Sequence, residues 1–410
     1  MMKKVVIVGS GAGGATVARE LASFFDVMII ERGARVEGKD AFKCYANVPS
    51  AVKIMRAFCL GGTTVVSVGN GVRFHDEIAG IRLDYENVER DIGVHPLPDS
   101  LMGEGTRMIA ESASDMGFDV ERMPKFIAAS KCIQDGRCAF GCSTSAKWTA
   151  LNFVEHAEKC GASVITETVV EEIVVRGGEV KGVVARPSHS TNAKFIEADA
   201  VVLAAGALET PLLLQKAGLP ASPDSLFTDT FITVGGVIPE RTKKDARINF
   251  SREIPMGIFI QFENFILSPH FARDLPNALR RNGINARNSE VLGIMVKIKD
   301  EEKGVIRNGS VEKGVSAHDA EILAEGASIA GAILVNAGVL PGSLVSTSPR
   351  GAHPGGTAKI GVAVDRNLET EASGLFVADA SLLPEAPGAP PILTIVALAK
   401  HAADVLKELC

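Results

Sequence analysis

The chain has few aromatic residues, no excess of basic residues and no long hydrophobic run. Its 410 residues include one Trp and two Tyr, and the 43 Lys and Arg are outnumbered by 49 Asp and Glu, for a net charge of −6. An acidic chain with interspersed charges gives no reason to expect a nucleic-acid partner. No segment approaches the ~18 apolar residues of a membrane span, and the run at residues 5–8 is too short for a signal peptide. We therefore expect a cytoplasmic protein. We also expect two domains, because a chain of this length is too long for one hydrophobic core.

Glycine, by contrast, is abundant, and several of the 41 glycines follow the first predicted strand. Residues 5–30 have the pattern strand, glycine turn, helix, strand, and the turn contains G-x-G-x-x-G at Gly9, Gly11 and Gly14. In such a turn the backbone can approach a pyrophosphate, and the helix N-terminus supplies partial positive charge. Glu31 follows the second strand, where a carboxylate can bind a ribose diol. The pattern predicts a dinucleotide site but does not separate FAD from NAD.

The remaining segments predict a second α/β stretch, a β-rich part and a return to α/β character. In the second stretch we expect a helix at 150–160 and strands at 163–166, 169–176, 180–186 and 200–205. The β-rich part has strand patterns at 227–235, 256–262 and 291–298, followed by a helical pattern at 317–337. These patterns favour a cofactor domain made by both ends of the chain and interrupted by a sheet domain.

Three further glycine-rich segments follow one another in a specific order. LGGTT at 60–64 is accompanied by Arg73, VVLAAGA at 201–207 by Thr210-Pro211, and GLFVADAS at 374–381 by Pro384. With the N-terminal turn, they resemble the glucose–methanol–choline (GMC) oxidoreductases, flavoenzymes that bind FAD and oxidise alcohols. The resemblance runs from residue 5 to about 406 and is weakest over 220–340. It implies cofactor contacts from Gly61, Gly62, Thr63, Thr64, Val170, Ala205, Gly206, Asp379, Ala380 and Pro391, besides Gly9, Gly11, Gly14 and Glu31.

The fold that this resemblance implies is α/β, or α+β overall. We expect a discontinuous, Rossmann-like FAD-binding domain at residues 1–225 and 345–410, which includes a cysteine segment at 130–150. An antiparallel-sheet substrate domain is expected at 226–344. The single segments also have simpler interpretations, such as a turn at Gly61-Gly62 or a helix cap at Asp379.

The sequence AHPGGT at 352–357 resembles the family's catalytic segment and makes His353 the candidate base. Imidazole suits this work because its pKa lies near neutral pH. The chain departs from the family at Pro390, where a second His or Asn is usual. Because proline has no side-chain donor or acceptor, it cannot share the substrate oxygen with His353. Ser67 stands where the family often has Asn. We therefore expect another side chain of the sheet domain to replace the second group, or altered chemistry.

Three of the seven cysteines, Cys132, Cys138 and Cys142, have C-x5-C-x3-C spacing. This segment resembles one that carries a three-iron four-sulfur (3Fe-4S) cluster in flavoprotein subunits of some sugar dehydrogenases of the family. Thiolates favour such clusters. A related segment without a cluster occurs in GMC long-chain alcohol oxidases, so structural cysteines are the alternative.

These observations predict an FAD-dependent dehydrogenase that oxidises a small alcohol, such as a sugar or polyol, by hydride transfer. An iron–sulfur cluster would pass the electrons to an acceptor protein or subunit. One alternative is an oxygen-using FAD oxidase with structural cysteines. The other is a flavin electron-transfer subunit without alcohol chemistry, which Pro390 suggests.

Overall fold

The structure is a computed structural model, and it describes residues 2–239 and 249–409. Its first sheet is parallel, with five strands in the order β22-β13-β1-β2-β9. Their apolar residues are buried between layers, as in other sheets covered on both faces. The strands are β1 (Lys4–Val8), β2 (Asp26–Ile30), β9 (Ser163–Ile165), β13 (Ala200–Leu203) and β22 (Leu375–Val377).

Helices from both ends of the chain cover the parallel sheet. α1 (Ala12–Leu21) packs against α4 (Ala150–Lys159) and α8 (Ile392–Leu409). α1 begins at Ala12, so that its first turn includes Gly13 and Gly14 of the glycine turn. The core of this part joins residues near the N-terminus to residues of α8, as the predicted discontinuous cofactor domain requires.

A small antiparallel sheet extends this part of the molecule. It contains β10 (Thr168–Arg176), β11 (Glu179–Pro187) and β12 (Lys194–Glu197). Gly177 and Gly178 join the first two strands, and both have positive φ angles, 63° and 78°. The strands predicted at 169–176 and 180–186 therefore form an antiparallel hairpin across these glycines.

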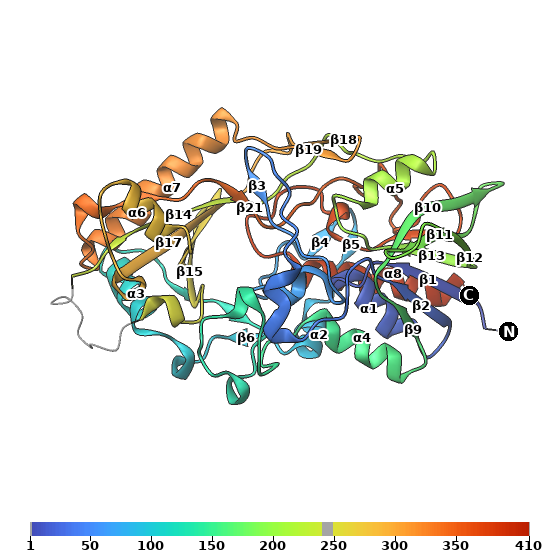
Figure 1. Cartoon of the computed structure of the whole chain (residues 1–410), viewed down its shortest axis with the longest axis horizontal. Coiled ribbons are helices and arrows are strands. Elements are labelled where there is room, and N and C mark those ends of the chain that lie inside the picture. The colour runs from blue at the N-terminus through green and yellow to red at the C-terminus, as the bar shows by residue number, and fades with distance from the viewer. Residues whose placement is uncertain (1, 240–248, 410) are drawn as a thin grey trace.

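The second large sheet is mostly antiparallel and lies at the opposite end of the molecule (Figure 1). Its order is β3-β21-β14-β17-β16-β15-β7, and β20 pairs with β14. α7 (Ala317–Asn336) packs on β17, and α3 (Glu104–Asp115) packs on α7. The strands are β3 (Lys53–Ile54), β7 (Glu121–Arg122), β14 (Thr230–Val237), β15 (Ile258–Gln261), β16 (Phe265–Pro269), β17 (Val291–Ile298), β20 (Val345–Ser346) and β21 (Arg350–Gly351).

Shorter elements complete the two parts. The helices are α2 (Tyr85–Ile92), α5 (Thr210–Lys216) and α6 (Leu275–Arg281). α2 packs on α8, α5 on β10, and α6 on β14 and β20. The strands are β4 (Glu77–Ile78), β5 (Ile81–Arg82), β6 (His95–Pro96), β8 (Pro124–Lys125), β18 (Val305–Arg307) and β19 (Ser310–Glu312).

Two sheets with separate cores agree with the predicted α/β fold and its sheet-bearing second part. The exact domain boundaries stay a prediction. α3 and β7 precede residue 225, yet they pack in the second core and pair with β15, respectively. The second part of the molecule thus includes α3 and β7, which precede residue 225, as well as residues 226–344.

Candidate active site

A cavity of about 930 Å³ opens where the parallel strands end. Gly9 follows β1, Glu31 follows β2, Ala205 and Gly206 follow β13, and Asp379 follows β22, so that their carboxyl ends meet at one edge. Open α/β sheets bind ligands at this edge. The other wall comes from the second sheet, through Phe231, Met295 and Lys297 among others.

The glycine turn leaves room for a phosphate at one position only. A Cβ on Gly9 would lie 2.3 Å from the carbonyl oxygen of Ala204, and one on Gly14 would lie 2.0 Å from that of Gly9. A Cβ on Gly13 would lie 1.6 Å from the oxygen of Ala378. At Gly11, in contrast, nothing lies within 4 Å, and the residue faces the cavity at the start of α1. The turn therefore fits the pyrophosphate of FAD, which would lie over Gly11 against the helix N-terminus.

Glu31 is held in place by the turn it faces. Its Oε2 accepts hydrogen bonds from the backbone N–H of Ser10 at 3.1 Å and from Ser10 Oγ at 2.7 Å, and Oε1 accepts the Gly33 N–H at 2.8 Å. Burial raises the pKa of this carboxyl, and these donors oppose the rise. Ser10 Oγ also accepts the Gly61 N–H at 3.0 Å. Glu31 thus stabilises the two glycine segments in addition to facing the cavity.

The structure brings most of the sequence-predicted residues to this one cavity. Gly14 and Gly61 are not among the lining residues; Gly14 packs below the turn, and Gly61 (φ 89°) bonds to Ser10. The lining set contains Gly9, Gly11, Glu31, Gly62, Thr63, Thr64, Val170, Ala205, Gly206, His353, Asp379, Ala380 and Pro391.

Asp379 links the end of β22 to the end of β13. Its Oδ2 accepts the Gly206 N–H at 2.8 Å and the Thr210 hydroxyl at 2.6 Å, and its Oδ1 accepts the Ser381 N–H at 2.8 Å. The last bond caps a short 3-10 helix at Ala380–Leu382. Asp379 therefore caps this helix and also lines the cavity.

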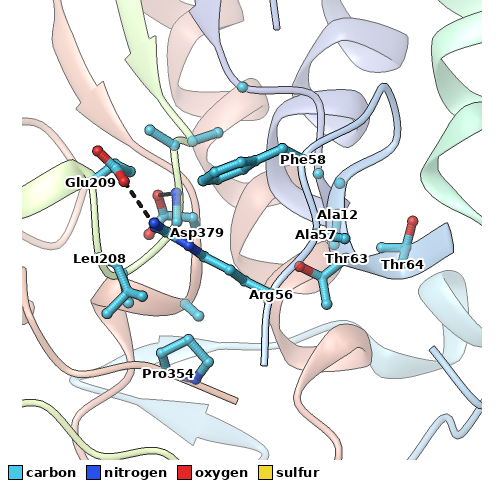
Figure 2. A pocket seen from close by; sticks show the side chains of 18 of the residues that line it. Ala12, Arg56, Ala57, Phe58, Thr63, Thr64, Leu208, Glu209, Pro354 and Asp379 are labelled. Atoms are coloured by element: carbon cyan, nitrogen blue, oxygen red, sulfur yellow. Dashed lines mark hydrogen bonds and ion pairs between the residues drawn. The ribbon is translucent and has the colours of Figure 1, made fainter. Parts of the chain in front are cut away.

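Figure 2 shows Arg56 in the cavity, reaching Glu209 beside Phe58. The guanidinium lies 2.8 Å from Glu209 Oε1, and Arg32 binds the same oxygen at 3.0 Å. Both guanidinium groups stack on the ring of Phe58, at 4.4 and 4.3 Å from its centroid. Sequence reasoning missed this group, because its members lie in three separate segments and match no motif.

His353 lies at the sheet-side wall, 20% exposed to the cavity. Its Nδ1 lies 2.8 Å from Asp229 Oδ2 and 3.3 Å from Lys297 Nζ. Nε2 has no hydrogen-bond partner within residues 2–239 and 249–409. Burial, with the charge of Lys297, holds the pKa of His353 well below its usual value. The imidazole is therefore neutral at pH 7 and can accept a proton at Nε2.

Asp229 is fully buried, and its Oδ1 accepts the Gly388 N–H at 2.9 Å. Burial raises the pKa of Asp229; the charges of Lys297 and Lys299 oppose this rise, and that of Asp300 adds to it. Asp229 carried no sequence motif. Lys297 did carry a signal, since it is the one charged residue of the otherwise apolar segment 291–298.

Pro390, Pro391 and Ser67 also line the cavity. Asn70 lines it as well and accepts a hydrogen bond at 2.6 Å from the buried Nζ of Lys125. The predicted replacement for the missing group at Pro390 has candidates on the sheet domain, namely Lys297 and His270, which both line the cavity.

The predicted iron–sulfur site is not supported. Cys132, Cys138 and Cys142 do not line the cavity, and the described residues contain no group of three or more His, Cys, Asp or Glu side chains placed to hold a metal. Burial raises the thiol pKa values of Cys132 and Cys138, whereas at Cys142 burial is outweighed by hydrogen bonds from the Lys147 N–H and neighbouring donors, which lower the thiol pKa. Backbone carbonyls of this segment have protein partners instead: Ala139 accepts the Tyr45 hydroxyl at 2.7 Å, and Cys138 accepts Lys147 Nζ at 3.0 Å.

None of the helices built from residues 2–239 and 249–409 combines the length and the apolar composition needed to cross a bilayer.

Comparison with known proteins agrees with this architecture. An uncharacterized protein of Methanocaldococcus jannaschii is 32% identical over 97% of this chain and 98% of its own length. An uncharacterized GMC-type oxidoreductase of Mycobacterium tuberculosis is 30% identical over 97% of this chain and 75% of its own. A long-chain-alcohol oxidase of Arabidopsis thaliana is 23% identical over 98% and 66%, respectively.

Two solved structures share the fold. Pyridoxine 4-oxidase from Mesorbium loti superimposes with a TM-score of 0.73 at 15% identity, covering 99% of both chains. Formate oxidase gives a TM-score of 0.75 at 15% identity, covering 99% of this chain and 98% of its own. The sequence models of the N- and C-terminal parts of the GMC oxidoreductases match residues 4–237 and 314–399. The chain therefore belongs to the GMC oxidoreductase family.

Proposed function

We propose that this protein uses FAD to oxidise the alcohol group of a small organic substrate to a carbonyl. One observation carries the proposal: Asp229 engages Nδ1 of His353, which leaves Nε2 as a neutral acceptor at the cavity that the glycine turns also line. The bound flavin supplies the acceptor for the hydride. The protein's own side chains bind and orient the alcohol, and Nε2 takes the hydroxyl proton.

The substrate that fits this cavity has an apolar body. Phe231, Met256 and Met295 line it on the sheet side, and they belong to one buried apolar cluster. Burying polyol hydroxyls against such side chains costs free energy unless each finds a partner. We therefore favour alcohols with hydrocarbon substituents over the sugars that the cysteine segment suggested. A relative named long-chain-alcohol oxidase supports the same direction.

The experiment is anaerobic mixing of the flavin-loaded protein with a panel of primary alcohols, from ethanol to long chains, and with sugars. Bleaching of the flavin band by an alcohol is the expected result. His353→Gln should keep its flavin and bleach ~100-fold more slowly or worse, the scale for loss of a general base. His189→Gln is the matched control, because His189 is 82% exposed. Flavin that no alcohol bleaches would favour an electron-transfer subunit instead.

The electron acceptor separates two forms of this function. Relatives and structural neighbours named as oxidases support dioxygen. The cysteine segment is the argument for a dehydrogenase that passes electrons to a protein or subunit. Reoxidation of the bleached flavin in air decides between them: hydrogen peroxide formed at the turnover rate indicates an oxidase, and slow reoxidation indicates a dehydrogenase.

A further inference from the structure

Lys297 is a charged residue that the packing of β17 directs into the cavity. Side chains alternate along a strand. Leu292, Ile294, Val296 and Ile298 face the core under α7, whereas Met295 and Lys297 face the cavity. Across the sheet, Lys297 is opposite Phe231 on β14 and Ile266 on β16, both buried. The ammonium therefore emerges from an apolar wall, with 3% of the residue exposed.

The hydrogen bonds around this ammonium are incomplete. Within the described chain, its one hydrogen-bond partner is His353 Nδ1, at 3.3 Å. That nitrogen also lies 2.8 Å from Asp229. A ring nitrogen carries either a proton or a lone pair, so it cannot donate to Asp229 and accept from Lys297 at once. When Nδ1 donates its hydrogen bond to Asp229, the three donors of Lys297 have no acceptor among the described protein atoms, which is costly for a buried cation unless the occupant of the cavity supplies one.

The segment that precedes α8 does not supply a side-chain donor to the cavity at residues 390 and 391. Pro390 and Pro391 lie there, and proline offers no side-chain donor. A cation that could stabilise negative charge on a substrate oxygen at His353 Nε2 lies on the sheet side of the cavity. Lys297 is the buried cation that both contacts His353 and lines the cavity.

We propose that Lys297 is a second catalytic residue, whose ammonium donates to the substrate oxygen and stabilises its developing negative charge. The inference rests on the proposed alcohol oxidation. In that step the O–H proton would go to His353 Nε2, the C–H hydrogen would leave with its bonding electron pair as a hydride for the flavin that the cavity would hold, and the C=O bond would form. Negative charge collects on the oxygen as the proton leaves, and a fixed cation beside it stabilises that charge.

The charges around Lys297 are compatible with this role. Burial lowers the pKa of Lys297 to about 8, and the charge of Asp229 opposes the shift, so the ammonium is present at pH 7. The other ionisable groups that interact with this trio are Asp300, Lys299 and His270. Burial lowers the pKa of His270 to about 4, which leaves it neutral. Asp300 is paired with Lys313 at 2.7 Å, so it is not free to neutralise Lys297.

The test compares Lys297→Met and Lys297→Arg with the control Lys303→Met, whose lysine is 67% exposed. The first readout is the binding of butyrate, an oxyanion mimic, without turnover. The change in the flavin spectrum measures this binding. Lys297→Met should weaken butyrate binding by about 10-fold or more, whereas Lys297→Arg and Lys303→Met should retain it. In the unmodified protein, butyrate binding should fall as the pH rises above about 8.

The second readout is anaerobic flavin reduction across pH. Lys297→Met should slow it by about 10²–10³-fold, as loss of an oxyanion donor does, and should abolish the decline above pH 8. Unchanged butyrate binding in Lys297→Met would overturn the proposal, even if flavin reduction slowed through an indirect effect of the substitution on His353. If Lys297→Met does not fold or loses flavin, the same comparison with Lys297→Gln and Lys297→Arg decides. If butyrate binding depends on Lys297 but no alcohol reduces the flavin, the proposed alcohol oxidation is refuted. The contact between Lys297 and an anion is then still supported.

Discussion

Asp229 Oδ2 lies 2.8 Å from Nδ1 of His353, although the two residues are 124 positions apart in the sequence. Asp229 precedes β14, and His353 follows β21, its antiparallel neighbour in the sheet. Its other oxygen is fixed by the Gly388 N–H, so the carboxylate has little freedom. When Asp229 is ionised, this contact favours the tautomer with the proton on Nδ1, which leaves Nε2 unprotonated.

Replacing Asp229 by Asn should therefore impair proton removal while the fold persists. An amide can donate to Nδ1, which would place the imidazole proton on Nε2, where it blocks the base. Flavin content should stay normal, and reduction by the alcohol should slow by ~100-fold or more. Rapid-mixing absorbance measures this rate, with the exposed Asp224→Asn as control. A normal rate in Asp229→Asn would mean that the tautomer does not matter to the reaction.

The glycine turn offers a second prediction, because two neighbouring glycines have opposite surroundings. Gly11→Val should fold and lose FAD, since the new side chain enters the open space kept for the pyrophosphate. Gly13→Val should fail to fold stably, since its Cβ would overlap the carbonyl oxygen of Ala378 at 1.6 Å. Circular dichroism and flavin content separate these outcomes. Gly11→Val that purifies with a full flavin complement would show that the cofactor lies elsewhere.

Sequence patterns located the cofactor side of the site much better than the substrate side. Gly9, Gly11 and Glu31 lie within one strand–turn–helix–strand unit, where local spacing determines local geometry. Asp229 and Lys297, in contrast, meet His353 only through the pairing of distant strands. The cysteine spacing predicted a cluster that the described residues do not support, because spacing alone does not show whether sulfur atoms converge. The lone lysine in an apolar strand was the one sequence signal that was overlooked.

A third prediction concerns Lys125, which is fully buried and donates to the oxygens of Val68, Asn70 and Pro255 at 3.1, 2.6 and 2.7 Å. Burial lowers its pKa to about 7, below the ordinary lysine value of 10.5 that we assign to the unfolded chain. Between these values the unfolded state binds the extra proton. The contribution of Lys125 to the free energy of unfolding should therefore increase with pH from about 7 to about 10, by at most about 1.4 kcal/mol per pH unit.

Urea unfolding followed by fluorescence of Trp148, the one tryptophan, tests this sign. The stability of the unmodified protein relative to Lys125→Met should rise across that pH range. Lys131→Met is the control, because Lys131 lies exposed in the neighbouring segment and should leave the pH dependence unchanged. A difference between the unmodified protein and Lys125→Met that stays constant from pH 7 to 10 would show that Lys125 keeps an ordinary pKa in the fold.

The last prediction concerns the cysteine segment, where resemblance and structure disagree. Lys147 Nζ donates to the carbonyl oxygens of Val65, Ser67 and Cys138 at 3.0, 2.5 and 3.0 Å, so this buried cation ties the segment to the loop beside the flavin site.

On this account the cysteine segment is structural, and protein purified without oxygen should contain a full complement of flavin and no iron. Lys147→Met would leave three buried carbonyls unpaired and should lower the melting temperature markedly. Cys138→Ser keeps its backbone carbonyl, so it should retain that bond, the flavin and the rate of flavin reduction, with at most a modest loss of stability. Iron analysis and the visible spectrum decide: stoichiometric iron that disappears in Cys138→Ser would restore the cluster and the dehydrogenase function that depends on it.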